Sequence, residues 1–378
     1  MIYLDNLATT PPLPEVGEAM RPYLGERFGN PTHLHQLGLA AAEGIRLARE
    51  DAANLLSCTP DAITFVSSGT EAANNAVKGL AWKKRAGHIV LSGAEHPALH
   101  DSALFLQKSG FSVSFLPVDG EGMLDPEEVR KALRPDTLLI ATHAANHDSG
   151  ARQNLAAIGR IAREAPVPFL VDATLAGGWD DLKPDLIPCD LMTLSPHRFH
   201  GPKGAGILYQ RPGLSLEPLI HGGRQESGRR AGTESVAAIA GVGAACRAAL
   251  RERETRVAEV ASLRAVLWDA MVPLIPDLHL NGPAFGPRRD ARHLSVSFSG
   301  VEAESLMLLL DLRGVAVTAA SGCLGPGEKY SRVLRSMGLS EARIRSAILM
   351  APGLGQTAAE MESAAGIIAQ AVEKIRKL

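Results

Sequence analysis

Residues 137–174 read TLLIATHAANHDSGARQNLAAIGRIAREAPVPFLVDAT, and this stretch decides the fold class. Its two ends, TLLIATHA (137–144) and PFLVDAT (168–174), are short and almost wholly apolar, as strands buried on both faces are. Between them, NLAAIGRIAREA (154–165) has the apolar spacing of an amphipathic helix. A strand, a helix and a second strand in this order predict a parallel sheet with helical connections.

The same alternation extends in both directions from this stretch. A helical pattern, LGLAAAEGIRLAREDAANLL (37–56), precedes the first strand of the series. The further candidate strands are AITFVSS (62–68), HIVLSG (88–93), SVSFLPV (112–118), LMTLS (191–195) and GAGILYQ (204–210). We therefore predict an α/β fold with a large domain whose mostly parallel sheet is covered by helices on both faces.

The pattern changes after residue 235. A long helical stretch (235–275), dense in charge in its second half, is expected to run from one domain to the next. Then follow the strand, helix and strand HLSVSFSG, AESLMLLLDLRG and VAVTAAS, and a final helix, AAEMESAAGIIAQAVEKIRKL. We predict a smaller α+β domain, and we assign residues 15–255 to the large domain and residues 1–14 and 256–378 to the small one.

Composition excludes several classes of protein. The chain has 378 residues, is 46% hydrophobic and 21% charged, and so can bury a core, while its net charge of −2 offers no basic surface to nucleic acid or anionic membrane. No apolar run approaches the roughly 18 residues of a membrane span, and the first residues lack the apolar stretch of a signal peptide. Four cysteines without a CxxC pair signal neither a disulfide framework nor a zinc site. We expect a soluble, cytoplasmic protein that binds no nucleic acid, membrane or metal.

Polar residues stand at three strand ends, where open α/β sheets bind ligands. Gly69 and Thr70, in SSGTEAANNA (67–76), begin a helix that offers N–H groups to an anion, although an ordinary helix cap also explains them. His96 follows the next strand, where a structural histidine is the alternative reading. Asp172 ends an apolar strand, so this carboxylate needs a cationic partner.

Three loops add further candidates. LSPHRFHGPKG (194–204) gathers Ser195, His197, Arg198 and Lys203 around one turn. HGGRQESGRRAGTES (221–235) is a glycine- and arginine-rich loop of the kind that approaches a phosphate or a neighbouring subunit. TAASGCLGPGEKY (318–330) places Cys323 among glycines, which favours a reactive thiol over a packed one.

Taken in order, these motifs resemble those of the cysteine desulfurases, pyridoxal-phosphate enzymes of fold type I in the class V aminotransferase group. YLDNLATTP near the N-terminus, FGNPTHLH (28–35) and HAANHDSG (143–150) belong to the same resemblance, which covers nearly the whole chain. It implies a homodimer that converts L-cysteine to L-alanine. By the same resemblance, the sulfur would pass to Cys323 as a persulfide and then to an acceptor or scaffold protein, for iron–sulfur cluster or thio-cofactor assembly.

The resemblance also assigns roles to single residues. Gly69, Thr70, Ser195 and His197 would hold the cofactor phosphate, and Thr233 would reach the phosphate of the partner subunit. His96 would stack on the pyridine ring and transfer protons. Asp172 would pair with the ring nitrogen, and Asn146 would lie near the ring hydroxyl.

Four positions depart from the family pattern. Arg198 occupies the place of the lysine that binds the cofactor covalently, and a guanidinium cannot do so. We therefore expect pyridoxal phosphate, if bound, to be held non-covalently. The arginine that clamps the substrate carboxylate is replaced by Leu354 or Gln356, and Leu175 follows VDAT where a glutamine is usual. NHDSG (146–150) has one residue more than the usual spacing.

Two functions remain open from the sequence. The first is a desulfurase-like enzyme that acts slowly or on an unusual substrate. The second is a non-catalytic homologue that serves as a sulfur relay, as a cluster scaffold with Cys323 as a possible cluster ligand, or as a regulatory partner of an active desulfurase.

Overall fold

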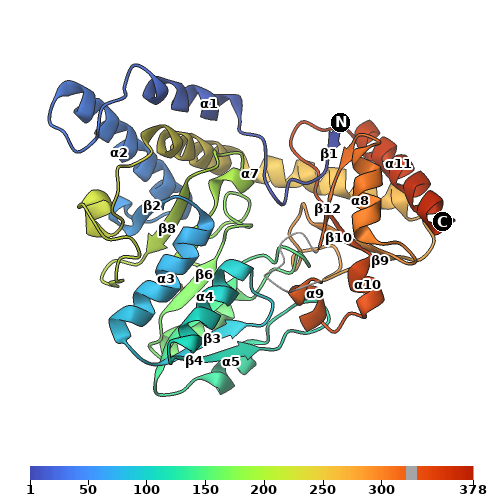
Figure 1. The fold of residues 1–378 in the computed structure, drawn as a ribbon, viewed down its shortest axis with the longest axis horizontal. Helices are drawn as coiled ribbons and strands as arrows, with labels where there is room; N and C mark the ends of the chain where they lie inside the picture. Colours follow the sequence, from blue (N-terminus) through green and yellow to red (C-terminus); the bar gives the residue numbers. More distant parts are fainter. Residues whose placement is uncertain (321–329, 378) are drawn as a thin grey trace.

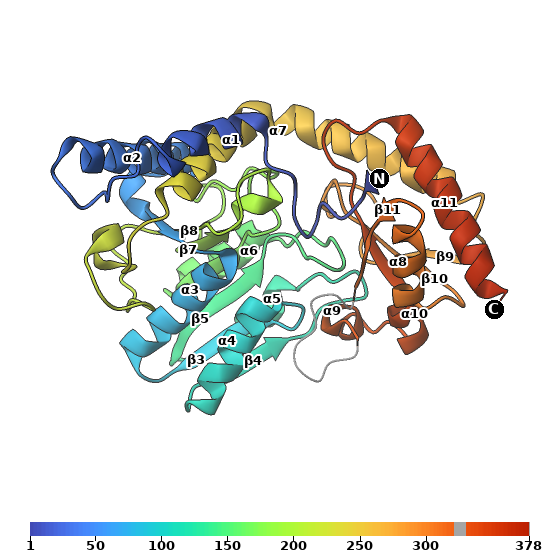
Figure 2. The same ribbon diagram turned by 45° about the horizontal axis from the view of Figure 1, so that its top comes forward.

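The structure is a computed structural model that describes residues 1–320 and 330–377 (Figure 1). Two bodies lie side by side, one built around a large sheet and one built mainly from the C-terminal residues (Figures 1 and 2). The long helix α7 (Val236–Met271) runs along both of them. Cys323 lies outside the described residues.

The large sheet confirms the predicted topology. In the described part of the chain it has seven strands in the order β2-β8-β7-β6-β5-β3-β4. Only β8 runs antiparallel to its neighbours, and the other pairings are parallel. The strands are β2 (Ile63–Val66), β3 (His88–Ser92), β4 (Ser112–Leu116), β5 (Thr137–His143), β6 (Phe169–Asp172), β7 (Leu191–Leu194) and β8 (Gly206–Gln210).

Helices cover both faces of this sheet, because alternate strand residues point to opposite sides. Leu139 and Ala141 of β5 pack with α3 (Gly69–Lys84) and α4 (Pro97–Lys108). Ile140 points to the other face, where α2 (Gln36–Leu56), α5 (Pro126–Ala132), α6 (Leu155–Glu164) and α7 contribute to the core. Shorter elements are α1 (Pro14–Met20) and the 3-10 turns η1 (Arg21–Leu24), η2 (Pro60–Ala62), η3 (Pro196–Arg198) and η4 (Gln225–Gly228).

The second body is α+β. Its antiparallel sheet has the order β12-β13-β10-β9 and packs on helices around a separate apolar core. The elements are β9 (Leu278–Leu280), β10 (Leu294–Phe298), α8 (Ala303–Asp311), β12 (Thr318–Ala319), α9 (Arg332–Ser336), α10 (Glu341–Arg345), β13 (Ala347–Met350) and α11 (Ala358–Arg376). Beside it, β1 (Ile2–Tyr3) pairs in parallel with β11 (Val315–Ala316).

Helix α7 joins the two cores. Cys246, in its first half, is fully buried in the core of the large sheet. Leu267 and Met271, near its end, are fully buried in the core of the second body. Among the described residues, no helix is both long and apolar enough to cross a membrane.

Candidate active site

One cavity opens at the carboxyl ends of strands of the large sheet. The space in it that is open to water-sized molecules is about 90 Å³. The residues that line it are Ser68, Gly69, Thr70, His96, Ala98, Asp172, Thr174, Ser195, His197 and Arg198. Side chains that follow β2, β3, β6 and β7 therefore meet at one place, as the polar strand ends predicted.

The first turn of α3 forms one wall. The Ser68 hydroxyl caps the helix by accepting a hydrogen bond from the Glu71 N–H at 3.1 Å. The N–H groups of Gly69 and Thr70 stand at the positive end of this 16-residue helix. A Cβ on Gly69 would lie 2.5 Å from Thr174 Cγ2, so only glycine lets this turn approach the neighbouring loop. The wall suits an anion such as a phosphate.

Asp172 lies at the end of β6. It is only 3% exposed. Its Oδ1 accepts hydrogen bonds from the Thr174 N–H at 2.9 Å and the Thr193 hydroxyl at 3.0 Å. These bonds leave the second carboxylate oxygen for another donor. A buried carboxylate on a cavity wall favours a cationic or N–H-bearing ligand.

His96 caps the start of α4. Its Nδ1 accepts a hydrogen bond from the Ala98 N–H at 3.1 Å, so the neutral ring carries its proton on Nε2. Burial lowers the pKa of His96 to about 4, and Arg198 and Arg332 add to this effect while Asp172 opposes it. The imidazole is therefore neutral at pH 7.

His147 is a neighbour of this site that the sequence did not single out. Its ring meets the His96 ring edge-on, with the two centroids 5.0 Å apart. Burial lowers the pKa of His147 well below its ordinary value, and the charge of Arg198 contributes. The only signal in the sequence was its place beside Asn146 in NHDSG, where Asn146 drew the assignment.

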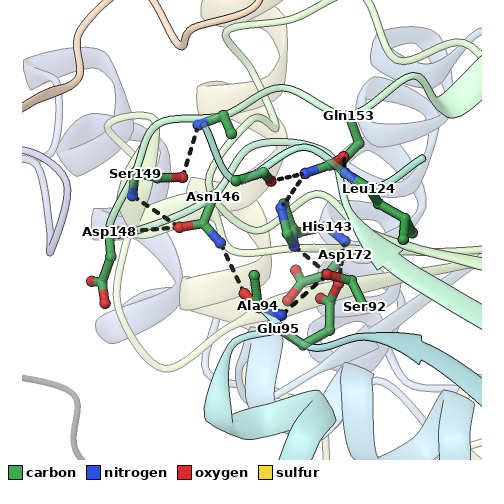
Figure 3. Close-up of polar contacts among 12 residues, drawn as sticks. Ser92, Ala94, Glu95, Leu124, His143, Asn146, Asp148, Ser149, Gln153 and Asp172 are labelled. Carbon is green, nitrogen blue, oxygen red and sulfur yellow. Dashed lines mark hydrogen bonds and ion pairs between the residues drawn. The ribbon is translucent and has the colours of Figure 1, made fainter. Parts of the chain in front are cut away.

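Asn146 itself holds two loops together (Figure 3). Its Nδ2 donates to the Ala94 carbonyl at 2.8 Å, and its Oδ1 accepts from the N–H groups of Asp148 and Ser149, both at 2.9 Å. Asn146 is not among the residues that line the cavity. A contact with a ring hydroxyl thus stays a prediction.

A buried polar network surrounds Glu95, the residue before His96 (Figure 3). Glu95 Oε1 accepts from the backbone N–H of His143 at 3.1 Å and pairs with His143 Nδ1 at 2.9 Å. Gln153 Nε2 contacts His143 Nε2 at 2.9 Å and donates to the Gly122 carbonyl at 2.8 Å. Because an amide nitrogen only donates, His143 Nε2 accepts and the His143 proton sits on Nδ1. The network fixes Glu95, and with it the turn that carries His96.

The loop after β7 forms the remaining wall. The His197 carbonyl accepts hydrogen bonds from the Thr10 N–H at 2.8 Å and the Thr10 hydroxyl at 2.9 Å. Burial, Arg198 and Lys203 lower the pKa of His197 to about 4. Arg198 lines the cavity, and its charge opposes the burial that raises the pKa of Asp5 to about 6.

The other predicted residues lie elsewhere. Thr233 lines a second cavity together with Ser67 and Arg230. Leu175 is buried, and Leu354 packs against the core of the large sheet. Gln356 accepts from the Gly353 N–H at 2.6 Å and donates to the Tyr3 carbonyl at 3.2 Å. Leu175, Leu354 and Gln356 place no positive charge at the cavity.

Comparisons with known proteins find relatives that match the whole chain. The family described as aminotransferase class-V matches residues 2–346. "Cysteine desulfurase IscS" of Dictyoglomus turgidum is 38% identical, over 100% of this chain and 96% of that protein. The protein of the same name from Methanosarcina thermophila is 39% identical, over 100% and 93%.

Solved structures show the same relationship. A "NifS-like protein" has a TM-score of 0.92 and 31% identity and covers 99% of both chains. "SspA in complex with cysteine" has a TM-score of 0.83 and 30% identity, over 94% of this chain and 100% of that one. The chain therefore has the fold type I architecture of these proteins.

Proposed function

Because the chain belongs to the class V aminotransferase family, we propose that it is a cysteine desulfurase-like, sulfur-handling protein that holds pyridoxal phosphate without a covalent bond. One observation carries the proposal. A single cavity joins the start of α3, Ser195 and His197 to Asp172 and His96, while an arginine occupies position 198.

The residues of the cavity fit those groups of the cofactor that are held without a covalent bond. The N–H groups of Gly69 and Thr70, with the Ser195 hydroxyl, suit its phosphate. The oxygen of Asp172 that Thr174 and Thr193 leave unused suits a protonated ring nitrogen. When bound, the cofactor supplies an electron sink for the α-carbon of an amino acid.

Arg198 cannot form the covalent bond that the lysine of the family makes with the cofactor. Its guanidinium stays protonated throughout the physiological range, so it cannot replace a lysine amine as a nucleophile or as a proton carrier. Proton transfer then falls to His96, which burial keeps neutral at pH 7 with a proton on Nε2. We expect such a site to act slowly, because the Ala98 N–H occupies Nδ1, Nε2 already carries a proton, and a ring with a pKa near 4 is a weak base at neutral pH.

The position that usually grips the substrate carboxylate is changed as well. A bidentate arginine is the usual partner of a substrate carboxylate, and Leu354 and Gln356 supply none. These departures favour a second candidate, in which the protein no longer turns over cysteine. It would then relay sulfur through Cys323, contribute to a cluster scaffold or regulate an active desulfurase. In either case we propose a cytoplasmic homodimer, in which Thr233 reaches the phosphate site of the partner subunit.

Absorbance of the purified protein tests the proposal. After addition of pyridoxal phosphate and dialysis, we expect the protein to retain the visible absorbance band of the cofactor. Treatment with borohydride should not attach the cofactor to any peptide. The control Ser195→Ala should weaken retention. A borohydride-labelled peptide would contradict non-covalent binding. A colourless protein that still accepts sulfur from a persulfide donor would favour the second candidate.

A further inference from the structure

We propose that the buried side chain of Arg292, held by Asp290, is a positioning residue for the loops that carry Asp172 and Ser195 to the cavity. The inference rests on the cofactor site proposed above. It concerns a segment, residues 290–293, that precedes β10 in the second body and does not line the cavity.

Arg292 connects two of the cavity loops. It is 1% exposed. Its Nη2 donates to the Leu175 carbonyl at 2.8 Å and its Nη1 to the Arg198 carbonyl at 3.3 Å. Its guanidinium carbon lies 4.3 Å from the centroid of the Trp179 ring, and the Trp179 indole also donates to the Arg198 carbonyl, at 2.9 Å. One planar group therefore sets the spacing of the chain after β6 and the chain after β7.

Asp290 fixes the position of that group. It accepts hydrogen bonds from the N–H, Nε and Nη2 of Arg292 at 2.9, 3.1 and 2.7 Å. Burial by itself raises the pKa of Asp290, but the charge and hydrogen bonds of Arg292 outweigh it and hold the pKa below its ordinary value. Asp290 is ionised at neutral pH, and the guanidinium is tied at one edge while its other donors face the loops.

The same segment reaches a third loop, the one that follows β5. The Asp290 N–H donates to the Gly150 carbonyl at 2.8 Å. His293 Nε2 donates to the His147 carbonyl, also at 2.8 Å. Burial lowers the pKa of His293 to about 3, so this ring stays neutral and keeps its proton for that bond. Residues 290–293 thus contact the loops after three adjacent strands, β5, β6 and β7.

Space filling does not explain this arrangement. Burying an arginine costs more than burying a leucine or methionine of similar volume, and it is repaid only when its donors are matched. Here the matched acceptors are the carbonyls of Leu175 and Arg198. They follow Asp172 and Ser195, respectively, by three residues in the chain. Arg289 offers a comparison, because it is also 1% exposed. Its side chain donates to the carbonyls of Asn281, Pro283 and His293, all in the second body.

The two arginines form a matched pair for the experiment. Lysine in place of either keeps the charge, but an ammonium cannot span two carbonyls as a planar guanidinium does. We expect Arg292→Lys to raise the Kd of pyridoxal phosphate, measured by equilibrium dialysis, about tenfold, as misplaced binding groups do. At saturation it should also change the visible circular dichroism of the bound cofactor. Arg289→Lys should change the Kd less than about twofold and leave that spectrum as in the wild type.

Hydrogen exchange keeps the test independent of cofactor binding. In Arg292→Lys, amides of residues 173–179 and 195–200 should exchange faster, whereas Arg289→Lys should affect residues 281–289 and leave those two loops unchanged. If the wild type binds no pyridoxal phosphate, the proposed function fails while the exchange pattern still decides this inference. Equal exchange in the two cavity loops of both variants would overturn it, as would an unchanged Kd and spectrum. If Arg292→Lys does not fold, the double variant Arg292→Gln with Asp290→Asn, which removes both charges, takes its place.

Discussion

At the scale of single residues, Arg198 and Leu354 mark two departures from the family pattern. Variants at these positions show how much each departure lowers the activity. Arg198→Lys should make pyridoxal phosphate bind covalently, with a shifted visible band and a borohydride-labelled peptide, but it should restore little release of alanine and sulfide from cysteine. A general acid–base group contributes roughly two to four orders of magnitude in rate, and the lysine supplies that part. The missing arginine near Leu354 still costs roughly 2–5 kcal/mol of substrate binding.

The double variant Arg198→Lys with Leu354→Arg is the matched comparison. It should release more alanine and sulfide than the single variant, in the same assay and at the same cysteine concentration. If the single variant Arg198→Lys turns over cysteine as fast as the double variant, the change at position 198 accounts for the whole loss of activity.

His200 provides a pH test at the same scale. Its Nδ1 contacts the Pro11 carbonyl at 2.9 Å, and burial lowers its pKa to about 4. Between about pH 6.5 and pH 4 the unfolded chain therefore binds a proton that the folded chain does not, so stability falls as the pH falls through this window. In urea unfolding, His200→Gln should remove about 1.4 kcal/mol per pH unit of that slope. The exposed His221→Gln serves as the control, and equal slopes in the wild type and His200→Gln would contradict the prediction.

The positions of site residues could be predicted from the sequence where a polar residue directly follows a buried strand. Gly69, His96, Asp172 and Ser195 were singled out by their places after strands, and the structure brings them to one cavity. The contacts of Glu95 and Arg292 could not be predicted. Their partners lie 48 residues away at His143 and 117 residues away at Leu175, and only the packed fold brings them together.

At the scale of elements, Gly206 shows how closely β8 passes the start of α3. A Cβ at this position would lie 2.5 Å from the carbonyl carbon of Ser68. Because that neighbour is backbone, the chain must shift to admit a methyl group. We expect Gly206→Ala to lower the free energy of unfolding by about 1–3 kcal/mol and to weaken phosphate binding at α3.

Gly366 is the control for that substitution. It lies within α11 and has nothing within 4 Å of a Cβ. Alanine there should stabilise the protein by about 0.5–1 kcal/mol, because alanine favours the helix. Chemical unfolding of both variants checks the pair, and a Gly206→Ala protein as stable as the wild type would contradict the close approach.

The strands of the large sheet could be predicted from the sequence, whereas some strands of the second body could not. All seven strands of the large sheet lie within the predicted runs, because buried parallel strands are continuous apolar segments. The short strands β9 and β13 were not predicted. Strand β9 has three residues and no usable period, whereas β13 is a four-residue apolar run as buried as β7, and the pairing of both with β10 joins segments distant in the chain.

At the scale of the whole molecule, α7 couples the two bodies. Since one 36-residue helix contributes to both cores, we expect a single unfolding transition. Trp179 reports on the large sheet and Trp268 on the second body. In a Trp82→Phe background, fluorescence and circular dichroism should give coincident midpoints. Leu267→Ala, at a fully buried position, should lower both by the same amount, at a cost of about 2–5 kcal/mol. Separate midpoints would show that the bodies unfold independently.

The N-terminal segment packs against residues from the far end of the chain, and this has a consequence for how the protein is made. Strand β1 pairs with β11, and the next residues continue this contact. The Asn6 side chain donates to the Ala351 carbonyl, 345 residues further along the chain. A ribosome that adds 5–20 residues per second needs roughly 20–70 seconds to produce the second partner after the first. During that time Asn6 lacks its final partner, whereas Thr10 of the same segment can already contact His197 once about half of the chain is made. The N-terminal segment is therefore among the last parts of the molecule to complete its contacts, and chaperones that bind nascent chains have their longest opportunity there.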